Sequence, residues 1–135
     1  MNTDEVDIWT MIHAERLRVA HMLEGLSQAE WQSISLCTRW SVEQVVAHLT
    51  AGAHTGGGAW LWSMVRAGFN ASKHNDRRLA RFAGGTPDET LALFRDAIPL
   101  TIAPSKDFAA WLGEVVVHGQ DIAQPLGYVL RPDPS

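Results

Sequence analysis

The sequence is poor in the features that mark several large classes of protein. Cys37 is the single cysteine, so an internal disulfide is excluded and a reducing, cytoplasmic location is expected. No run of about 18 apolar residues occurs, and the acidic N-terminus lacks the basic and apolar regions of a signal peptide, so no membrane partner is predicted. Acidic residues outnumber basic ones, 15 to 11, which argues against a nucleic-acid partner.

The residues that are abundant indicate one compact domain. The chain has 135 residues, 46% of them hydrophobic, which is enough for one sizeable core and therefore a single domain over residues 1–135. Charged residues make up 19%, too few for wholesale disorder. Six histidines and six tryptophans stand beside a single tyrosine, and the histidines provide the best clues to chemistry.

Apolar residues recur at helical spacing, and cap patterns predict where the helices begin. Ser, Thr or Asn followed three residues later by Glu or Gln occurs several times, most clearly where Thr86 precedes Pro87. Four main helices are predicted: from a cap at Asn2 to Gly25, from Ser41 through a kink or break at 56–58 to Val65, from Thr86 to before Pro99, and from about Lys106 to Gln124, with Pro125 and Gly127 as stop signals.

Between the second and third of these helices lies a polar and partly basic stretch, residues 69–85. We expect a long connection here, with a helical piece around residues 76–82. The predicted fold class is therefore all-α, a four-helix bundle with a long connection between helices 2 and 3.

One constellation of polar residues is typical of a metal site. Glu114 and His118 are four residues apart, so they share a stripe of the last helix that we expect to face the interior. His48 lies among apolar residues of the second helix, and its own stripe carries small residues, which leave space beside it: Ser41, Gly52, Thr55 and Ala59. Two histidines and a glutamate are ligands that zinc accepts, with a position left for water or substrate.

Each of these residues also has a simpler interpretation. A lone inward histidine such as His48 is more often a hydrogen-bonded core residue. A Glu–His pair at this spacing can be an ordinary hydrogen bond, and small residues can simply allow helices to approach. Asp121 can orient a metal-binding histidine through a hydrogen bond, can substitute as a ligand, or can serve only a structural role, and we favour the structural role.

The remaining candidates have weaker signals. His13 is expected to pack rather than to act as a fourth ligand, and His21, His54 and His74 are expected to be solvated or incidental. Cys37 is expected to be buried and inert. The tryptophans at 40, 60, 62 and 111 are expected to anchor the core. The arginines at 77, 78 and 81 can hold an anionic substrate, although we favour a solvated loop.

Two segments together resemble a known family. The run from Trp40 to Leu49 resembles the tryptophan-started helix of the mycothiol-dependent maleylpyruvate isomerase N-terminal domains, within the DinB-like superfamily, and the run from Glu114 to Asp121 resembles that family's Glu-x-x-x-His-x-x-Asp segment. The connection from Phe69 to Pro87 is similar as well. The resemblance covers about residues 10–130.

The resemblance implies a DinB-like bundle in which His48, Glu114 and His118 hold one divalent metal, usually zinc. It also implies mycothiol, a low-molecular-weight thiol, as cosubstrate, with its sulfur on the metal. Members often pair, which allows a homodimer. The isomerases carry a further C-terminal domain, which we expect this chain, ending at Ser135, to lack.

Two functions follow as expectations. The first is a metal-dependent thiol transferase or isomerase, in which a thiolate attacks a small electrophilic substrate. The second is a metal- or thiol-binding bundle without turnover, such as a sensor or interaction module. A plain structural bundle, with the three polar groups paired to one another, is the simplest alternative.

Overall fold

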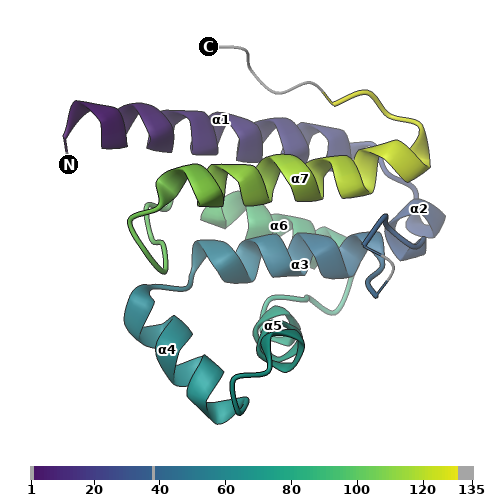
Figure 1. The fold of residues 1–135 in the computed structure, drawn as a ribbon. Coiled ribbons are helices and arrows are strands. Elements are labelled where there is room, and N and C mark those ends of the chain that lie inside the picture. The colour runs from purple at the N-terminus through teal and green to yellow at the C-terminus, as the bar shows by residue number, and fades with distance from the viewer. Residues whose placement is uncertain (1, 38, 131–135) are drawn as a thin grey trace.

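In the computed structural model, which describes residues 2–37 and 39–130, the described chain is helical and contains no strand (Figure 1). The helices are α1 (Thr3–Glu24), α2 (Gln28–Gln32), α3 (Val42–Ala53), α4 (Gly57–Arg66), α5 (Ala71–Ala80), α6 (Pro87–Ala97) and α7 (Phe108–Leu126). No helix among the described residues has both the length and the apolar character needed to cross a membrane.

The predicted cap patterns form at the helix starts. The side chains of Ser27 and Ser41 each accept a hydrogen bond in a complete capping box, with Glu30 and Gln44 reaching back to the backbone. At α6 the hydroxyl of Thr86 accepts from the backbone N–H of Glu89, and Pro87 occupies the first turn. Short-range sequence signals therefore determine where these helices begin.

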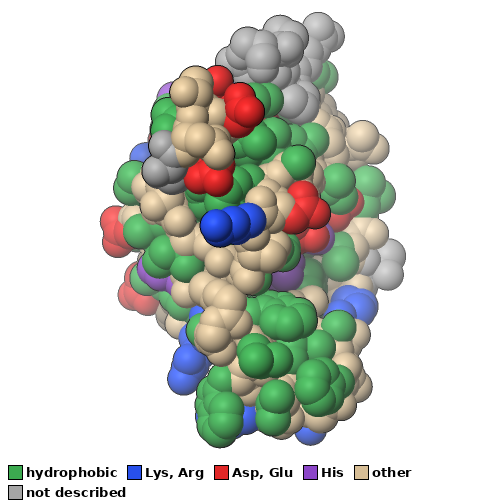
Figure 2. Space-filling model, turned by 60° about the vertical axis from the view of Figure 1, so that its left-hand side comes forward, with side chains coloured by type: hydrophobic (Ala, Val, Ile, Leu, Met, Phe, Trp, Pro, Cys, Tyr) green, Lys and Arg blue, Asp and Glu red, His purple; other side chains and the backbone are tan. Residues whose placement is uncertain are grey.

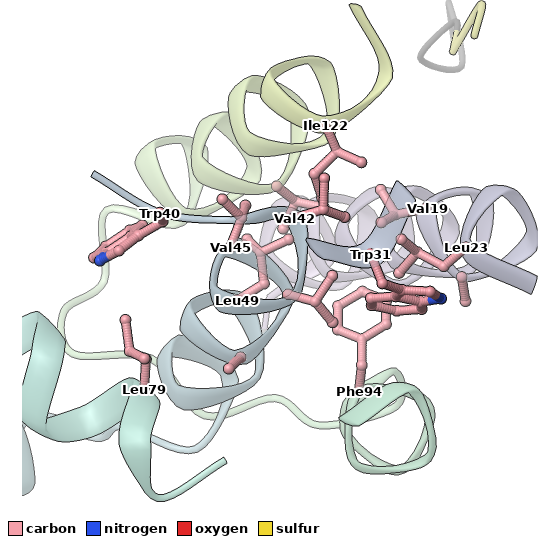
Figure 3. Packing of buried hydrophobic residues seen from close by; sticks show 14 of the residues in the cluster. Val19, Leu23, Trp31, Trp40, Val42, Val45, Leu49, Leu79, Phe94 and Ile122 are labelled. Carbon is pink, nitrogen blue, oxygen red and sulfur yellow. The ribbon is translucent and has the colours of Figure 1, made fainter. Parts of the chain in front are cut away.

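The four long helices α1, α3, α6 and α7 pack against one another. α1 and α7 lie side by side, α3 runs below them, and α6 lies behind α3 (Figure 1). Their shared core consists of fully buried aliphatic and aromatic side chains (Figure 3). Its most enclosed members are Ile12, Val19, Leu23, Val42, Val45, Val46, Phe94 and Ile122.

The glycines at 56–58 break the second predicted helix rather than bending it. α3 ends with His54 as its C-cap, and α4 begins after Gly56, whose lack of a side chain leaves that cap without a side-chain hydrogen bond. Glycine gives up about 1 kcal/mol of helix propensity relative to alanine, so a cluster of three favours a turn. The break directs α4 away from the line of α3 (Figure 1).

Two other boundaries differ from the prediction. The helical piece in the connection is α5, which begins at Ala71, five residues earlier than expected, because Asn70 caps it through the backbone N–H of Lys73. In α7, Pro125 lies inside the last turn, and the helix ends only at Gly127, which adopts a left-handed conformation with φ of 76°. Glycine adopts that conformation at little cost.

The prediction that all four tryptophans anchor the core is wrong for two of them. Trp40 is buried, but Trp60 and Trp62 on α4 are 39% and 65% exposed. They belong to a patch of exposed apolar side chains on and just after α4, which Figure 2 shows on the lower part of the molecule. The patch consists of Trp60, Leu61, Trp62, Val65 and Phe69.

Candidate metal centre

The structure brings His48, Glu114 and His118 to one point. Helix α3 supplies His48, and the neighbouring α7 supplies the other two from successive turns. The Nε2 atom of His48 lies 3.5 Å from Oε2 of Glu114, and Nε2 of His118 lies 3.1 Å from the same oxygen. The candidate ligand atoms of the three residues all lie within 4.8 Å of one another.

The three side chains differ in burial. The side chains of His48 and His118 are 16% and 15% exposed, but that of Glu114 is 48% exposed. The expectation of a buried carboxylate is therefore wrong. Glu114 faces a cavity instead of the packed interior, so its charge requires less compensation than a fully buried one.

Asp121 contacts the far side of the His118 ring, 3.1 Å from Nδ1 to Oδ2. Its position is supported by the loop before α3, because the backbone N–H of Leu36 donates to the carbonyl of Asp121 at 2.9 Å. Ionised carboxylates only accept hydrogen bonds, so a His118 that bonds both Glu114 and Asp121 must carry protons on both nitrogens. A histidine whose Nε2 binds a metal needs only its Nδ1–H for Asp121.

The electrostatics of this cluster shift two pKa values in opposite directions. Hydrogen bonds from His118 and His48 hold the pKa of Glu114 far below its ordinary value. Burial disfavours the charged form of His118, but hydrogen bonding and attraction to Glu114 and Asp121 outweigh it, and the pKa of His118 is raised. Without a metal, these contacts therefore favour the protonated form of His118 and the ionised form of Glu114.

The donor set and its spacing fit a zinc ion. Ligand atoms about 2.0–2.1 Å from zinc lie roughly 3.3 Å apart in a tetrahedral site. The two separations to Glu114, 3.1 Å and 3.5 Å, lie on either side of that value. Histidine with a carboxylate on its other nitrogen is also the usual arrangement around protein-bound zinc, and Asp121 provides it for His118.

A cavity of about 350 Å³ opens beside the three residues. Its walls come from α1, α3, α4, α5, α7 and the segments that precede α3 and α7. Gly52 and Thr55 line it, as predicted for two members of the small-residue stripe. A side-chain Cβ built at Gly52 would meet nothing within 4 Å. Trp40 also lines the cavity and packs against His48, with ring centroids 4.8 Å apart, which fixes the orientation of the imidazole.

Of the other four histidines, three lie where the sequence predicts and His74 does not. His13 packs on Trp9 and contacts the carbonyl of Leu100 through Nε2 at 3.0 Å, outside the cluster, as expected. His21 and His54 are exposed, and His54 stacks on the ring of Phe82. His74 does not fit the prediction of a solvated residue, because it is buried, lines the cavity and contacts the hydroxyl of Ser63 through Nδ1 at 2.8 Å.

The burial of Arg16 and Arg78 at the cavity differs from what the sequence predicts. Arg16 is buried and lines the cavity, although it was not among the candidates. It continues the buried stripe of α1 that includes Ile12 and Val19, so a basic residue at core spacing was the available signal. Arg78, expected in a solvated loop, is half-buried on α5 and also lines the cavity.

Cys37 is half-buried rather than fully buried, and it too lines the cavity. Its backbone carbonyl accepts hydrogen bonds from the hydroxyl of Ser35 and from the backbone N–H of Trp40. That its thiol is inert stays a prediction.

Fold and site together define a class, that of all-helical proteins with a His–Glu–His cluster between two packed helices and a cavity beside it. Residues 12–105 match the family described as the mycothiol maleylpyruvate isomerase N-terminal domain, and the chain belongs to this family. The match confirms the resemblance seen in the sequence; it includes His48 and ends before α7, so Glu114 and His118 rest on the geometry alone. Neither the curated proteins nor the solved structures gave a match.

Proposed function

We propose that the protein is a divalent-metal-dependent thiol transferase or isomerase that acts on a small electrophilic substrate, with mycothiol as the thiol. His48, Glu114 and His118 would hold the metal, most favourably zinc. The observation that carries the proposal is the convergence of two imidazole nitrogens and one carboxylate oxygen beside a cavity large enough for a small substrate. Membership of a mycothiol-related family supports the choice of thiol.

A bound divalent metal would lower the pKa of a coordinated thiol and so supply thiolate near neutral pH. The protein's own groups prepare the site for it. With a metal present, Asp121 would still accept from Nδ1–H of His118, and the unprotonated Nε2, which lies beside Glu114, would be available to the metal. Trp40 holds the His48 ring from the side.

The thiol and the electrophile would meet in the cavity. In a transferase the thiolate sulfur would form a bond to the electrophilic carbon while the leaving group departs with the electron pair of its own bond to that carbon, and the sulfur stays on the product. In an isomerase the thiolate would add to a conjugated double bond, whose π electrons move to the neighbouring electron-withdrawing group; the resulting single bond rotates, and those electrons re-form the double bond as the thiolate leaves. We assign no general base to the chain. We further infer that α1, α3, α6 and α7 form a four-helix bundle of the DinB-like type, with α4 and α5 in the connection between its second and third members.

A second candidate function is a bundle whose polar cluster serves structure or partner binding without turnover. One observation favours it: Glu114 already contacts both histidines, and Asp121 contacts His118, so the charged groups are paired without any ion. Such a network would be stable in its own right.

Cobalt substitution tests the proposed function. Cobalt(II) bound by two histidines and a carboxylate gives visible d–d absorption, and addition of mycothiol should add an intense sulfur-to-cobalt band at higher energy. We expect both signals in the wild-type protein and neither in Glu114→Gln, with turnover then sought by following loss of free thiol with small electrophiles. Cobalt binding that mycothiol leaves unchanged would reject the thiol assignment, and absence of stoichiometric cobalt binding would reject the metal.

A further inference from the structure

The α4–α5 segment carries a charge opposite to that of the rest of the chain. Residues 57–81 contain five basic side chains and one acidic side chain, a formal net charge of +4. The remaining residues contain six basic and 14 acidic side chains, a net charge of −8, and the two parts together give the −4 of the whole chain. The one carboxylate of the segment, that of Asp76, is already paired with Arg39. Such a concentration of positive charge attracts a negatively charged partner.

Four of the five basic side chains of the segment face solvent. Lys73, Arg77 and Arg81 follow one another at intervals of four residues, so they form one stripe along α5 and its C-cap. All three are exposed, as is Arg66 at the end of α4. Within the described part of the chain, none of these four cations forms an ion pair. Their charge is therefore available to a partner.

The apolar patch lies on the same segment. Its side chains come from the exposed side of α4 and from the turn that follows, and basic side chains border the patch in Figure 2. The two most exposed members are Trp62 and Phe69, at 65% and 68%. A contiguous apolar patch with a polar rim is typical of a surface that binds a partner or a membrane.

The backbone at Phe69 supports a role for its ring. Phe69 has a φ of 60°, in the left-handed region that bulky residues rarely adopt. Packing does not explain this conformation, because the side chain is exposed and lies outside the hydrophobic core. Residues held in such conformations are concentrated at functional sites. The conformation therefore indicates that the ring is presented to a partner.

We propose that this face of α4 and α5 docks on the surface of an anionic lipid bilayer. The apolar patch enters the boundary between headgroups and acyl chains, and the basic side chains contact the anionic headgroups. Helices that lie on membranes combine aromatic and aliphatic side chains with lysine and arginine in this way. The proposal goes against the sequence expectation of no membrane partner, which considered only spanning and signal segments.

A second copy of the chain fits this face less well than a bilayer does. If the patch paired with itself, two segments of net charge +4 would meet, and like charges across an interface repel. A stable dimer also buries about 800 Å² on each partner, more than five partly exposed side chains provide. An anionic bilayer offers apolar surface for the patch and negative charge for the cations at once.

Co-flotation with lipid vesicles tests the proposal on the full chain. One set of vesicles is phosphatidylcholine alone, and the other contains equal parts of phosphatidylcholine and phosphatidylglycerol. A chelator is present, so that zinc cannot bridge protein and lipid, and the test does not depend on the proposed metal. We expect binding to be about tenfold or more tighter to the anionic vesicles and to weaken as salt is added. No binding to anionic vesicles, or equal binding to both kinds, would overturn the proposal.

Substitutions in the patch test the apolar contribution. The double variant Trp62→Gln, Phe69→Asn removes the two most exposed rings, and asparagine tolerates the left-handed backbone at position 69. We expect binding to anionic vesicles to fall about tenfold or more. Leu17→Gln is the control, because Leu17 is an apolar residue of α1 that is 48% exposed. Full binding by the double variant, or an equal loss in Leu17→Gln, would overturn the assignment to the patch.

A matched pair of charge variants tests the basic stripe. Arg77→Gln removes one exposed cation of the stripe, and we expect binding to anionic vesicles to fall about fivefold. Lys106→Gln removes one exposed cation outside the segment and should leave binding nearly unaltered. Equal effects of the two substitutions would overturn the role of the stripe, because they would reflect net charge alone.

The oligomeric state tests the other occupant of this face. Analytical ultracentrifugation compares the wild type with the Trp62→Gln, Phe69→Asn variant in the absence of lipid. We expect the two to sediment alike. A wild-type dimer that the double variant dissociates would overturn the proposal, because the patch would then be an interface between two copies. Circular dichroism of every variant verifies that the helices remain folded.

Discussion

The body formed by α1, α3, α6 and α7 and the segment formed by α4 and α5 are built in different ways. The body buries side chains such as Ile12, Val46 and Ile122 completely, whereas Met64 and Leu79, buried in the segment, keep some exposure. The segment is held by Leu79, which belongs to the hydrophobic core, and by polar contacts, among them the hydrogen bond from Arg78 to Thr55 and the ion pair of Arg39 with Asp76. The cavity lies where body and segment meet, so both parts of the chain shape access to the site.

The largest effect is expected from a core deletion in the body. Phe94→Ala removes a side chain that is 1% exposed, and we expect a loss of about 3–5 kcal/mol in the free energy of unfolding. Leu61→Ala on α4, where the side chain is 54% exposed, should change it by at most about 0.5 kcal/mol. Urea denaturation measures the free energy of unfolding of both variants. Similar losses in the two would contradict the proposed difference between body and segment.

The second prediction concerns the support of the metal position within the body. Asp121→Asn keeps the shape but weakens the hold on His118, and we expect zinc affinity to fall about 10–100-fold. Competition with a chromophoric chelator measures the change. Asp96→Asn, at an exposed position of α6, is the control and should leave the affinity unaltered; an unaltered affinity in Asp121→Asn would show that Asp121 has only a structural role.

The third prediction separates stability from access. Gly52→Leu should raise helix stability by up to about 1 kcal/mol while its side chain fills part of the cavity and weakens the binding of mycothiol to the zinc-loaded protein. Gly113→Leu on α7 is the control, because a Cβ there also meets nothing within 4 Å but Gly113 does not line the cavity. If both variants bind mycothiol equally well, the cavity is not where the ligand lies.

The smallest effect is a difference in pH dependence. The pKa of His118 is raised above 6.5, so in the metal-free protein its stabilisation is complete below that pH and is lost as pH rises through the raised value. The pKa of Glu114 is lowered, so the stabilisation that its ionised form provides is complete above pH 4.5 and is lost only at much lower pH. Zinc competes with protons for the histidines, so the stabilisation that bound zinc provides grows as the pH rises through the same range.

Thermal unfolding between pH 6 and pH 8 should therefore show a stability that rises more steeply with pH in the zinc sample than in the chelator sample, because His54 and His74, whose pKa values are lowered, contribute to both samples alike. Parallel curves in the two samples would mean that zinc does not bind through His118.

The sequence predicts much of the body and little of the segment. Local caps such as Ser41 with Gln44 mark helix starts, and the four-residue spacing of Glu114 and His118 places both on one face of α7, because these are properties of neighbouring residues. The charged lining of the cavity depends on how distant helices meet. Arg78 reaches the site only because the break after α3 brings α5 against that helix, and no local pattern specifies such a contact.

The most direct test of the account is the metal content of the full-length protein after zinc saturation and desalting, compared with His48→Ala and with His21→Ala. His21 is exposed on α1 and provides the control. The account predicts about one zinc ion per chain in the wild type and in His21→Ala, and almost none in a folded His48→Ala. A wild-type protein without zinc, or a His48→Ala variant that keeps its full complement, would contradict it.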